Sequence, residues 1–281
     1  MEPYVGTRYT YYSKDKNGDE NLLRSVFYSG HTISTKFYRI FPDLKVNSFG
    51  LEIDKLRHII TPSLEYAYIH DPTLPSDRLT AFESVDAITQ SNVLNLSLEN
   101  KLQTKRDGTS VDFLTLIIKS PYSFKMEGHG GRFGDINFDL EMFPNSRFKF
   151  WSDASFDLRR RSFRNANFDI EFTLNNKSKY GAGYRYSASD PTDSEVFTIS
   201  FESQLNPKWR VRGYHRFNFS QNYYEEQEYT LSRDLHCWEV EYTVNTKRKK
   251  GVSFWIGFKC KAFPDLGFDF TKSHHQPKTK P

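Results

Sequence analysis

The stretch EVFTISFESQLN, residues 195–206, decides the fold class. Its apolar side chains recur at every second position, and polar side chains fill the positions between them. Successive side chains of a β-strand point to opposite faces, so the stretch predicts a strand with one apolar and one polar face. The apolar set is Phe197, Ile199, Phe201 and Leu205, and the polar set is Thr198, Ser200, Glu202 and Gln204.

The same alternation recurs along the whole chain, as in 93–103, 136–142 and 167–175. It predicts an all-β, antiparallel fold with about fourteen strands. Most of them exceed the ~5–6 residues usual in soluble proteins and suit the ~9–11 that a tilted membrane-spanning strand needs. Only 76–90 is expected to hold a short helical turn. The predicted strands are 4–13, 24–41, 55–70, 91–105, 110–126, 133–144, 146–159, 163–175, 179–189, 194–206, 208–220, 222–233, 236–247 and 251–261.

Composition points to a particular kind of β protein. Aromatic residues make up 16% of the chain, which disordered chains lack, yet the mean hydropathy is −0.69. Two-faced strands of a transmembrane β-barrel combine these properties, because one face meets lipid and the other is polar. The net charge is +4 with both signs interspersed, so no nucleic-acid partner is expected. We expect residues 1–261 to form transmembrane β-barrel strands and 262–281 a C-terminal extension.

Turn lengths predict the orientation of this barrel. Tight turns at 144–146, 175–178 and 206–208 alternate with longer connections at 71–90, 127–132 and 187–194. Bacterial barrels place short turns in the periplasm and long loops outside, so 71–90 is expected to be the largest external loop. The expected connection 42–54 breaks this pattern, because it is long but falls on the periplasmic side.

Three segments carry a resemblance to a known family. Residues 56–69, LRHIITPSLEYAYI, resemble the H-x-I-x-P-x-x-x-Y-x-Y strand of the LptD family, the lipopolysaccharide-assembly outer-membrane proteins. Asp86, Ile88 and Asn92 are similar in order and spacing to the end of the loop that follows this strand. Residues 233–240, RDLHCWEV, resemble the cysteine-bearing penultimate strand. The resemblance extends over about 4–270, and Pro62 within the first segment is either a family feature or a local bulge.

The resemblance implies a function and a set of partners. It implies that the chain is the C-terminal half of a larger barrel in a Gram-negative outer membrane, either a fragment or a shorter relative. Such a barrel would insert lipopolysaccharide into the outer leaflet through a polar lumen and a lateral seam. The implied partners are lipopolysaccharide, outer-membrane lipid, a plug lipoprotein of the LptE type, and a periplasmic bridge that docks on an absent N-terminal domain. No cofactor and no catalysis are implied.

Arginines are the candidate lumen residues. Arg210, Arg212 and Arg216 share one face of the predicted strand 208–220, with Arg185 and Glu202 on neighbouring strands. Arginine binds phosphate in a bidentate manner, so these side chains are expected to contact lipopolysaccharide. Ordinary mixed charge in a wet lumen is the alternative. The basic runs at 159–161 and 247–250 have the same two interpretations.

The last predicted strand is the candidate seam. Gly257 lies in its middle, where glycine weakens pairing and packing, which suits an edge that must open. Alternatively, Gly257 only relieves crowding beside Trp255. The apolar face of this strand comprises Val252, Phe254, Ile256 and Phe258.

The two cysteines leave two interpretations open. A hairpin turn at 248–250 would set Cys237 opposite Lys261, so a disulfide with Cys260 is conceivable, and two free thiols are the alternative. The resemblance places Cys237 in a region whose cysteines pair with the N-terminal domain. No His cluster has metal-ligand spacing, and no Ser-His-Asp order stands out. A complete fourteen-stranded passive channel or fatty-acid-type lipid transporter and, less favoured, a surface hydrolase are the alternative functions.

Overall fold

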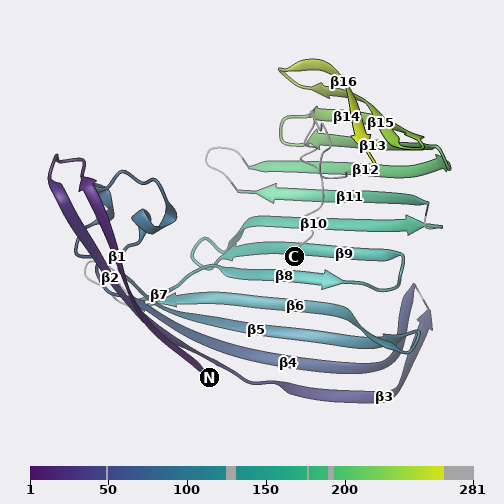
Figure 1. The fold of residues 1–281 in the computed structure, drawn as a ribbon. Helices are drawn as coiled ribbons and strands as arrows, with labels where there is room; N and C mark the ends of the chain where they lie inside the picture. The colour runs from purple at the N-terminus through teal and green to yellow at the C-terminus, as the bar shows by residue number, and fades with distance from the viewer. Residues whose placement is uncertain (49, 125–130, 176, 189–192, 263–281) are drawn as a thin grey trace. The chain divides into compact units, whose positions relative to one another are not determined.

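A computed structural model of the chain describes residues 1–48, 50–124, 131–175, 177–188 and 193–262. The described chain is almost entirely β-strand, with two short 3₁₀ turns, and every strand pairing is antiparallel (Figure 1). This confirms the predicted all-β, antiparallel fold. Among these residues, no helix is long and apolar enough to cross a membrane. The strands are β1 (Glu2–Lys14), β2 (Glu20–Ser34), β3 (Phe37–Ser48), β4 (Leu51–Ile69), β5 (Ser91–Arg106), β6 (Thr109–Ser123), β7 (Arg132–Phe133), β8 (Ile136–Met142), β9 (Phe148–Asp157), β10 (Ser162–Leu174), β11 (Ser178–Ser187), β12 (Ser194–Asn206), β13 (Trp209–Asn218), β14 (Tyr223–Leu235), β15 (Trp238–Lys247) and β16 (Gly251–Cys260).

The chain divides into two compact units. Unit 1 comprises Met1–Met142 with Asp153–Phe163, and unit 2 comprises Phe143–Ser152 with Arg164–Pro281. Within unit 1, the hydrogen-bonded order is β1-β2-β4-β5-β6-β8, with β3 beside β4 and β7 beside β6. Within unit 2, strands β10 to β16 pair in sequence order. The predicted division at 261/262 is not tested, because 263–281 lie outside the described residues.

Pro62 interrupts the predicted strand 24–41. Both β2 and β3 pair with β4, and the ladder stops at Ser34↔Ser63 and resumes at Phe37↔Ile60. Pro62 lies opposite this interruption and has no backbone N–H to donate. Its carbonyl still accepts the N–H of Thr35 at 3.3 Å. The interruption therefore has a local cause at this proline, and the strand continues beyond it.

The expected long connection 42–54 is wrong. Strand β3 runs to Ser48 and β4 begins at Leu51, so the connection is short. The predicted strand end at 41 falls just before Pro42, which lies in a bulge between the pairs Phe41↔Leu56 and Lys45↔Asp54. A bulge is one of the few places where a sheet tolerates proline. The apparent exception to the alternation of short and long connections is thereby removed.

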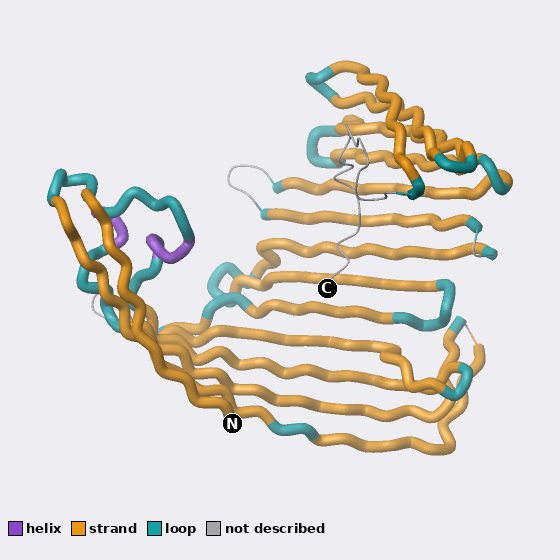
Figure 2. The backbone as a smooth tube through the Cα atoms, viewed as in Figure 1, coloured by secondary structure: helices purple, strands orange, loops and turns teal. Residues whose placement is uncertain are grey.

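Short and long connections lie at opposite ends of unit 1. In unit 1, the short turns before β4 and β6 lie at one end, and 15–19 and 70–90 lie at the other (Figure 2). The turn Asp107-Gly108 has positive φ at both residues, as a two-residue type I′ hairpin requires. In unit 2, the turns 175–177, 207–208 and 236–237 oppose 188–193, 219–222 and 248–250. We call these two ends the short-turn end and the long-loop end.

The expected helical turn in 76–90 is confirmed as two 3₁₀ turns, Ser76–Arg78 and Ser84–Ala87. The loop that carries them, 70–90, covers part of the β1–β2 hairpin in unit 1. Val26 of β2 and Leu74 and Leu79 of the loop are buried there. Elsewhere the sheet has few buried apolar side chains, and most large apolar residues of one face are exposed. The most buried apolar packing of unit 1 thus lies under this loop.

Candidate functional site

A buried arginine fixes loop 70–90 to the hairpin. Arg24 of β2 is only 2% exposed. Its guanidinium donates three hydrogen bonds to loop carbonyls: Nε to Leu74 at 2.8 Å, Nη1 to Val85 at 2.8 Å and Nη2 to Ile88 at 2.5 Å. A buried cation is stable only when it is well hydrogen-bonded. One side chain therefore defines the path of the loop at three points.

Asp86 holds the second half of the loop. Its carboxylate accepts the backbone N–H groups of Phe82 and Glu83, at 2.9 and 3.0 Å, and the hydroxyl of Tyr12 on β1. The hydrogen bond from Tyr12 and these two amides hold the pKa of Asp86 below its ordinary value, against the opposing effect of burial. Asp86 and Ile88 of the family-like segment thus both bind the β1–β2 hairpin.

A second ionic contact ties the start of the loop to the β1–β2 turn. Arg78 donates to Asp15 at 2.8 and 2.5 Å and to Asp19 at 2.5 Å. The carboxylate of Asp15 also accepts the N–H groups of Asn17 and of Asp19. Burial opposes ionisation of Asp15, but Arg78 and these amides outweigh it, so the pKa of Asp15 is lowered. Loop 70–90 is therefore held as a fixed cover on the long-loop end of unit 1.

The candidate arginines do share one face of unit 2. The β12–β13 register pairs Arg212 with Glu202 and Arg216 with Thr198. The even-numbered side chains of these two strands therefore share one face, as expected. Arg210 is opposite Gln204 on the same face. Arg185 of β11 lies on this face too, because it comes two positions after Gly183, which is opposite Thr198. The structure thus brings together Arg185, Arg210, Arg212, Arg216 and Glu202 on one polar face.

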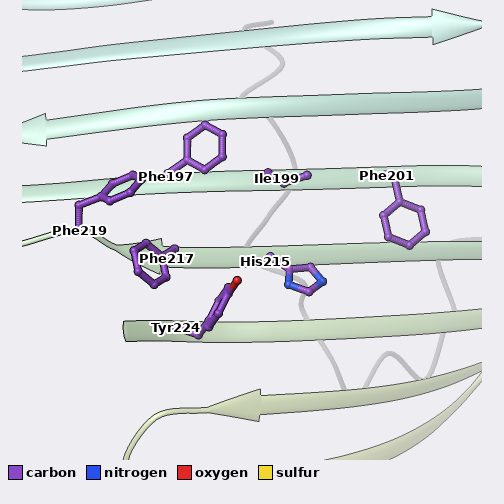
Figure 3. Close-up of a pocket in the computed structure, with 7 residues that line it drawn as sticks. All are labelled: Phe197, Ile199, Phe201, His215, Phe217, Phe219 and Tyr224. Atoms are coloured by element: carbon purple, nitrogen blue, oxygen red, sulfur yellow. The ribbon is translucent and has the colours of Figure 1, made fainter. Parts of the chain in front are cut away.

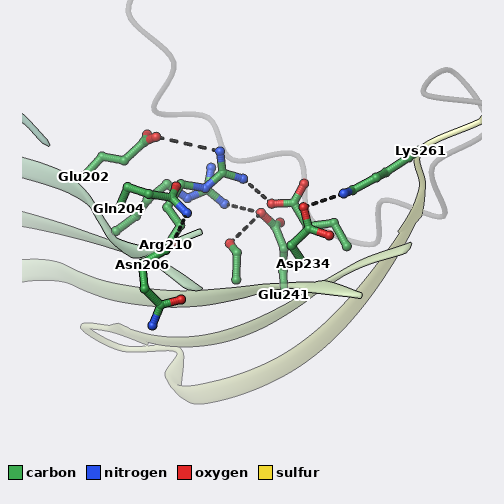
Figure 4. A network of polar contacts seen from close by, with 10 residues as sticks. Glu202, Gln204, Asn206, Arg210, Asp234, Glu241 and Lys261 are labelled. Carbon is green, nitrogen blue, oxygen red and sulfur yellow. Dashed lines mark hydrogen bonds and ion pairs between the residues drawn. The ribbon is translucent and has the colours of Figure 1, made fainter. Parts of the chain in front are cut away.

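Each of these arginines has a carboxylate partner. Arg185 contacts Asp169 at 2.6 Å, Arg212 contacts Glu241 at 2.8 Å, and Arg216 forms a 2.5 Å ion pair with Glu225. Arg210 pairs closely with Glu239 and lies 3.8 Å from Glu202 (Figure 4). The polar face is therefore a network of paired opposite charges.

Two of these pairs reach across an intervening strand. Arg210 and Arg212 lie on β13, but their partners Glu239 and Glu241 lie on β15. The β14 residue between them is small: Ser232 is opposite both Arg210 and Glu241, and its hydroxyl donates to Glu241 at 3.1 Å. A phosphate approaching this face must compete with carboxylates for each arginine. Contact with lipopolysaccharide stays a prediction.

The opposite face of unit 2 is apolar and exposed. Ile170 and Ile199 are 41% and 48% exposed, and each is opposite Ala182 of β11. The exposed apolar face continues across the following strands, with Tyr229, Val244 and Phe254. Contiguous exposed apolar surface of this kind marks contact with a partner or a membrane.

The candidate seam strand is an edge in the described part of the chain. β16 pairs with β15 over its whole length, from Lys247↔Gly251 to Trp238↔Cys260. Val252, Phe254, Ile256 and Phe258 lie on one face and are all exposed. A Cβ added at Gly257 would meet only the Cβ of Glu241, at 3.9 Å. Ordinary contact at this distance means that Gly257 is not required to relieve crowding beside Trp255.

The hairpin turn lies where it was expected, at 248–250. The N–H of Lys261 donates to the carbonyl of Cys237 at 3.0 Å, so these residues are opposite each other. Both Cys237 and Cys260 are free thiols in the structure. Within the described ranges, no group of three or more His, Cys, Asp or Glu side chains is arranged to hold a metal ion.

Comparison with known proteins gives only remote similarity. No protein-family profile matches the sequence, and no curated protein matches it. Solved structures of porin variants align over most of the chain. One is a mutant of Rh. blastica porin, with a TM-score of 0.39 and 8% identity, covering 91% of this chain and 96% of that chain. Another is a triple mutant of Rhodopseudomonas blastica porin, with a TM-score of 0.38, 8% identity and the same coverage. Similarity this low does not establish a shared function.

Sequence reasoning missed the residues that anchor loop 70–90. Arg24, Tyr12 and Asp15 occur in or beside predicted strands, and nothing in their local sequence distinguishes them from other polar-face residues. Their partners lie about 50–75 positions later in the chain. The one available signal was Asp86, which the family resemblance already singled out.

Proposed function

We propose that the chain forms part of the wall of a β-barrel in a Gram-negative outer membrane, and that this barrel delivers lipopolysaccharide to the outer leaflet. The observation that carries the proposal is the pair of faces on long antiparallel strands. One face exposes apolar side chains such as Ile170 and Ile199, and the other bears the paired charges around Arg212. Lipid-facing and lumen-facing residues alternate in this way in transmembrane barrels.

The anchoring of loop 70–90 supports the family interpretation. Two of the three residues matched in that segment, Asp86 and Ile88, accept hydrogen bonds from the hairpin strands. The third, Asn92, pairs with Tyr68 on β4 at the start of β5. The matched spacing therefore coincides with positions that fix the loop on the polar face of β1 and β2. A passive channel requires no such coincidence.

In the proposed mechanism, the sugar and phosphate groups of lipopolysaccharide pass along the polar face while the acyl chains stay in the membrane. Arg185, Arg210, Arg212 and Arg216 would exchange their carboxylate partners for phosphate in turn. Because each arginine is already paired, no single site would hold the lipid tightly, which suits passage rather than storage. The edge strand β16 would border the lateral exit. A plug lipoprotein of the LptE type and a periplasmic bridge are the proposed protein partners.

The alternative is a complete, passive channel. The balanced charge of the polar face favours it, because a face of paired opposite charges also suits a water-filled pore that carries small solutes. The two functions differ in where lipopolysaccharide touches the protein. A passive channel would meet its acyl chains only on the apolar face, whereas the assembly protein would meet its phosphates on the polar face.

Photo-crosslinking distinguishes the two functions. The full chain is reconstituted in vesicles that contain lipopolysaccharide, with a benzophenone amino acid at Glu202 or Arg212 on the polar face, or at Tyr229 on the apolar face. We expect lipopolysaccharide adducts at the two polar-face positions. Adducts at Tyr229 alone, together with a steady ionic conductance in planar bilayers, would favour the passive channel and contradict the proposal.

A further inference from the structure

An aromatic groove interrupts the exposed apolar face of unit 2. It has a volume of about 460 Å³ and is open to the surface (Figure 3). This volume lies within the ~300–1,000 Å³ range of ligand pockets. Seven side chains from β12, β13, the 219–222 turn and β14 line it: Phe197, Ile199, Phe201, His215, Phe217, Phe219 and Tyr224.

Two local features of the strands create this groove. Gly213 has no side chain, and the ring of Phe201 lies over it where a Cβ would collide. Near the long-loop end, the β13–β14 register shifts between Arg216 and Phe217. Beyond the shift, Phe217 packs edge-on against Phe219 at 5.0 Å and Tyr224 at 5.1 Å. The rings therefore form a wall at one end of the groove, and Phe201 forms the other.

A basic turn lies next to the aromatic wall. The turn 248–250 bears Arg248, Lys249 and Lys250, all exposed. It is fixed to β14, because the N–H of Arg248 donates to the carbonyl of Glu225 at 3.0 Å. The guanidinium of Arg248 lies 3.4 Å from the ring centroid of Tyr223, which points to the face opposite to Tyr224 and the groove, because consecutive strand residues alternate. The exposed Lys249 and Lys250 are therefore the cations that this turn can offer to the groove at the long-loop end.

We propose that this groove binds one acyl chain of an anionic lipid, whose headgroup phosphate is bound by Lys249 and Lys250 of the basic turn 248–250. The inference rests on the proposed membrane location of the chain. The charge of the turn selects an anionic headgroup, since Lys and Arg bind phosphate, and the aromatic lining suits a hydrocarbon chain. The site would lie on the outer surface of the wall, separate from the charged polar face.

The test compares two photoactivatable lipids in phosphatidylcholine vesicles that contain the full chain. One set carries a diazirine on the acyl chain of phosphatidylglycerol, and the other carries it on phosphatidylcholine. We expect the anionic probe to label peptides 194–206 and 209–224 more than the zwitterionic probe. Neutralising the two lysines with Lys249→Gln and Lys250→Gln should bring this ratio towards one, at about five-fold for each lysine that contacts the headgroup.

Two matched variants test the groove itself. Ile199→Trp fills it with an apolar side chain, whereas Ile170→Trp makes the same change on the other side of Ala182, outside the groove. Labelling should fall at least several-fold in the first and stay unchanged in the second. Equal labelling by the two probes in the unaltered chain, or equal effects of the two Trp variants, would overturn the inference while the membrane location stands. Failure of the chain to insert into vesicles would overturn the proposed function and this inference together.

Discussion

At the scale of single residues, Arg24 has the largest structural effect on the candidate site. It satisfies three carbonyls between Leu74 and Ile88, whereas the other hydrogen bonds of the loop to β2 come from His70 and Thr73 at its start. Leaving a buried donor or acceptor without its hydrogen-bond partner typically costs about 1–3 kcal/mol. Sequence alone placed Arg24 in a strand, although β2 begins earlier, at Glu20, but the acceptors of Arg24 are backbone carbonyls. Carbonyls are common to all residues, so no sequence pattern could have identified them.

We therefore expect Arg24→Met to release loop 70–90. The variant leaves the carbonyls of Leu74, Val85 and Ile88 without their donor, while the apolar stem is largely kept. Hydrogen exchange and limited proteolysis within 70–90 should both accelerate strongly. The matched control is Arg8→Met, on the same face of the hairpin but exposed, where surface substitutions change stability by only about ±0.5 kcal/mol. Equal effects of the two variants would contradict the anchoring role.

The anchored carboxylates predict how the loop responds to acid. The pKa of Asp86 is lowered in the folded chain, so its ionised form stabilises the fold. This contribution is complete above the unfolded-state pKa of about 4 and is lost as the pH falls through the lower folded value. Protection of 70–90 from hydrogen exchange, corrected for intrinsic rates, should stay level from pH 7 to about 4 and drop below that.

Asp86→Asn should lower this protection at neutral pH and weaken its acid dependence. Asp77→Asn, in the same loop but exposed, serves as the control and should behave as the unaltered chain. A loss of protection between pH 7 and 5 would instead implicate a histidine and contradict the assignment.

At the scale of strands, the two-residue period was sufficient to locate almost every element. Where it failed, the cause was proline. The predicted strand 24–41 ended just before Pro42, which lies in a bulge, and Pro62 interrupts the neighbouring ladder from inside β4. The ion pairs between β13 and β15 were also beyond prediction, because a pair that spans a strand depends on the small side chain of Ser232 between the charges.

The two faces of β12 predict opposite responses to one substitution. Ile199 and its neighbour Ser200 are both exposed but on opposite faces. Arginine on a lipid-facing midplane position costs about 2–4 kcal/mol in membrane barrels, whereas the polar face already holds arginines. Ile199→Arg should therefore impair membrane insertion far more than Ser200→Arg, as measured by folding yield in vesicles. Equal impairment would remove the membrane interpretation.

Gly257 tests the seam interpretation of β16. Because there is room for a Cβ at this position, Gly257→Ala should strengthen β15–β16 pairing by about 0.5–1 kcal/mol. Slower hydrogen exchange across 252–260 would report this gain. If the strand must open, transfer of lipopolysaccharide should fall in the same variant. Faster exchange would restore the crowding interpretation beside Trp255.

At the scale of the whole molecule, the distribution of connections predicts how the chain lies across the membrane. Within unit 1, loop 70–90 lies at one end of the strands and the turn Asp107-Gly108 lies at the other. Long loops of bacterial barrels are external and short turns are periplasmic. This rule was already applicable to the sequence, and the short β3–β4 turn removes the one connection that contradicted it.

A pair of epitope tags tests this orientation directly. Pro75 is exposed within loop 70–90, and Gly108 is exposed in the opposite turn, so each site should accept a short insertion without disturbing a strand. In intact cells, an impermeant antibody should label the tag at Pro75 and not the tag at Gly108. After permeabilisation of the outer membrane, both tags should be labelled equally. Labelling of Gly108 alone in intact cells would reverse the orientation of unit 1. Labelling of both sites before permeabilisation would mean that the strands between them do not cross a membrane.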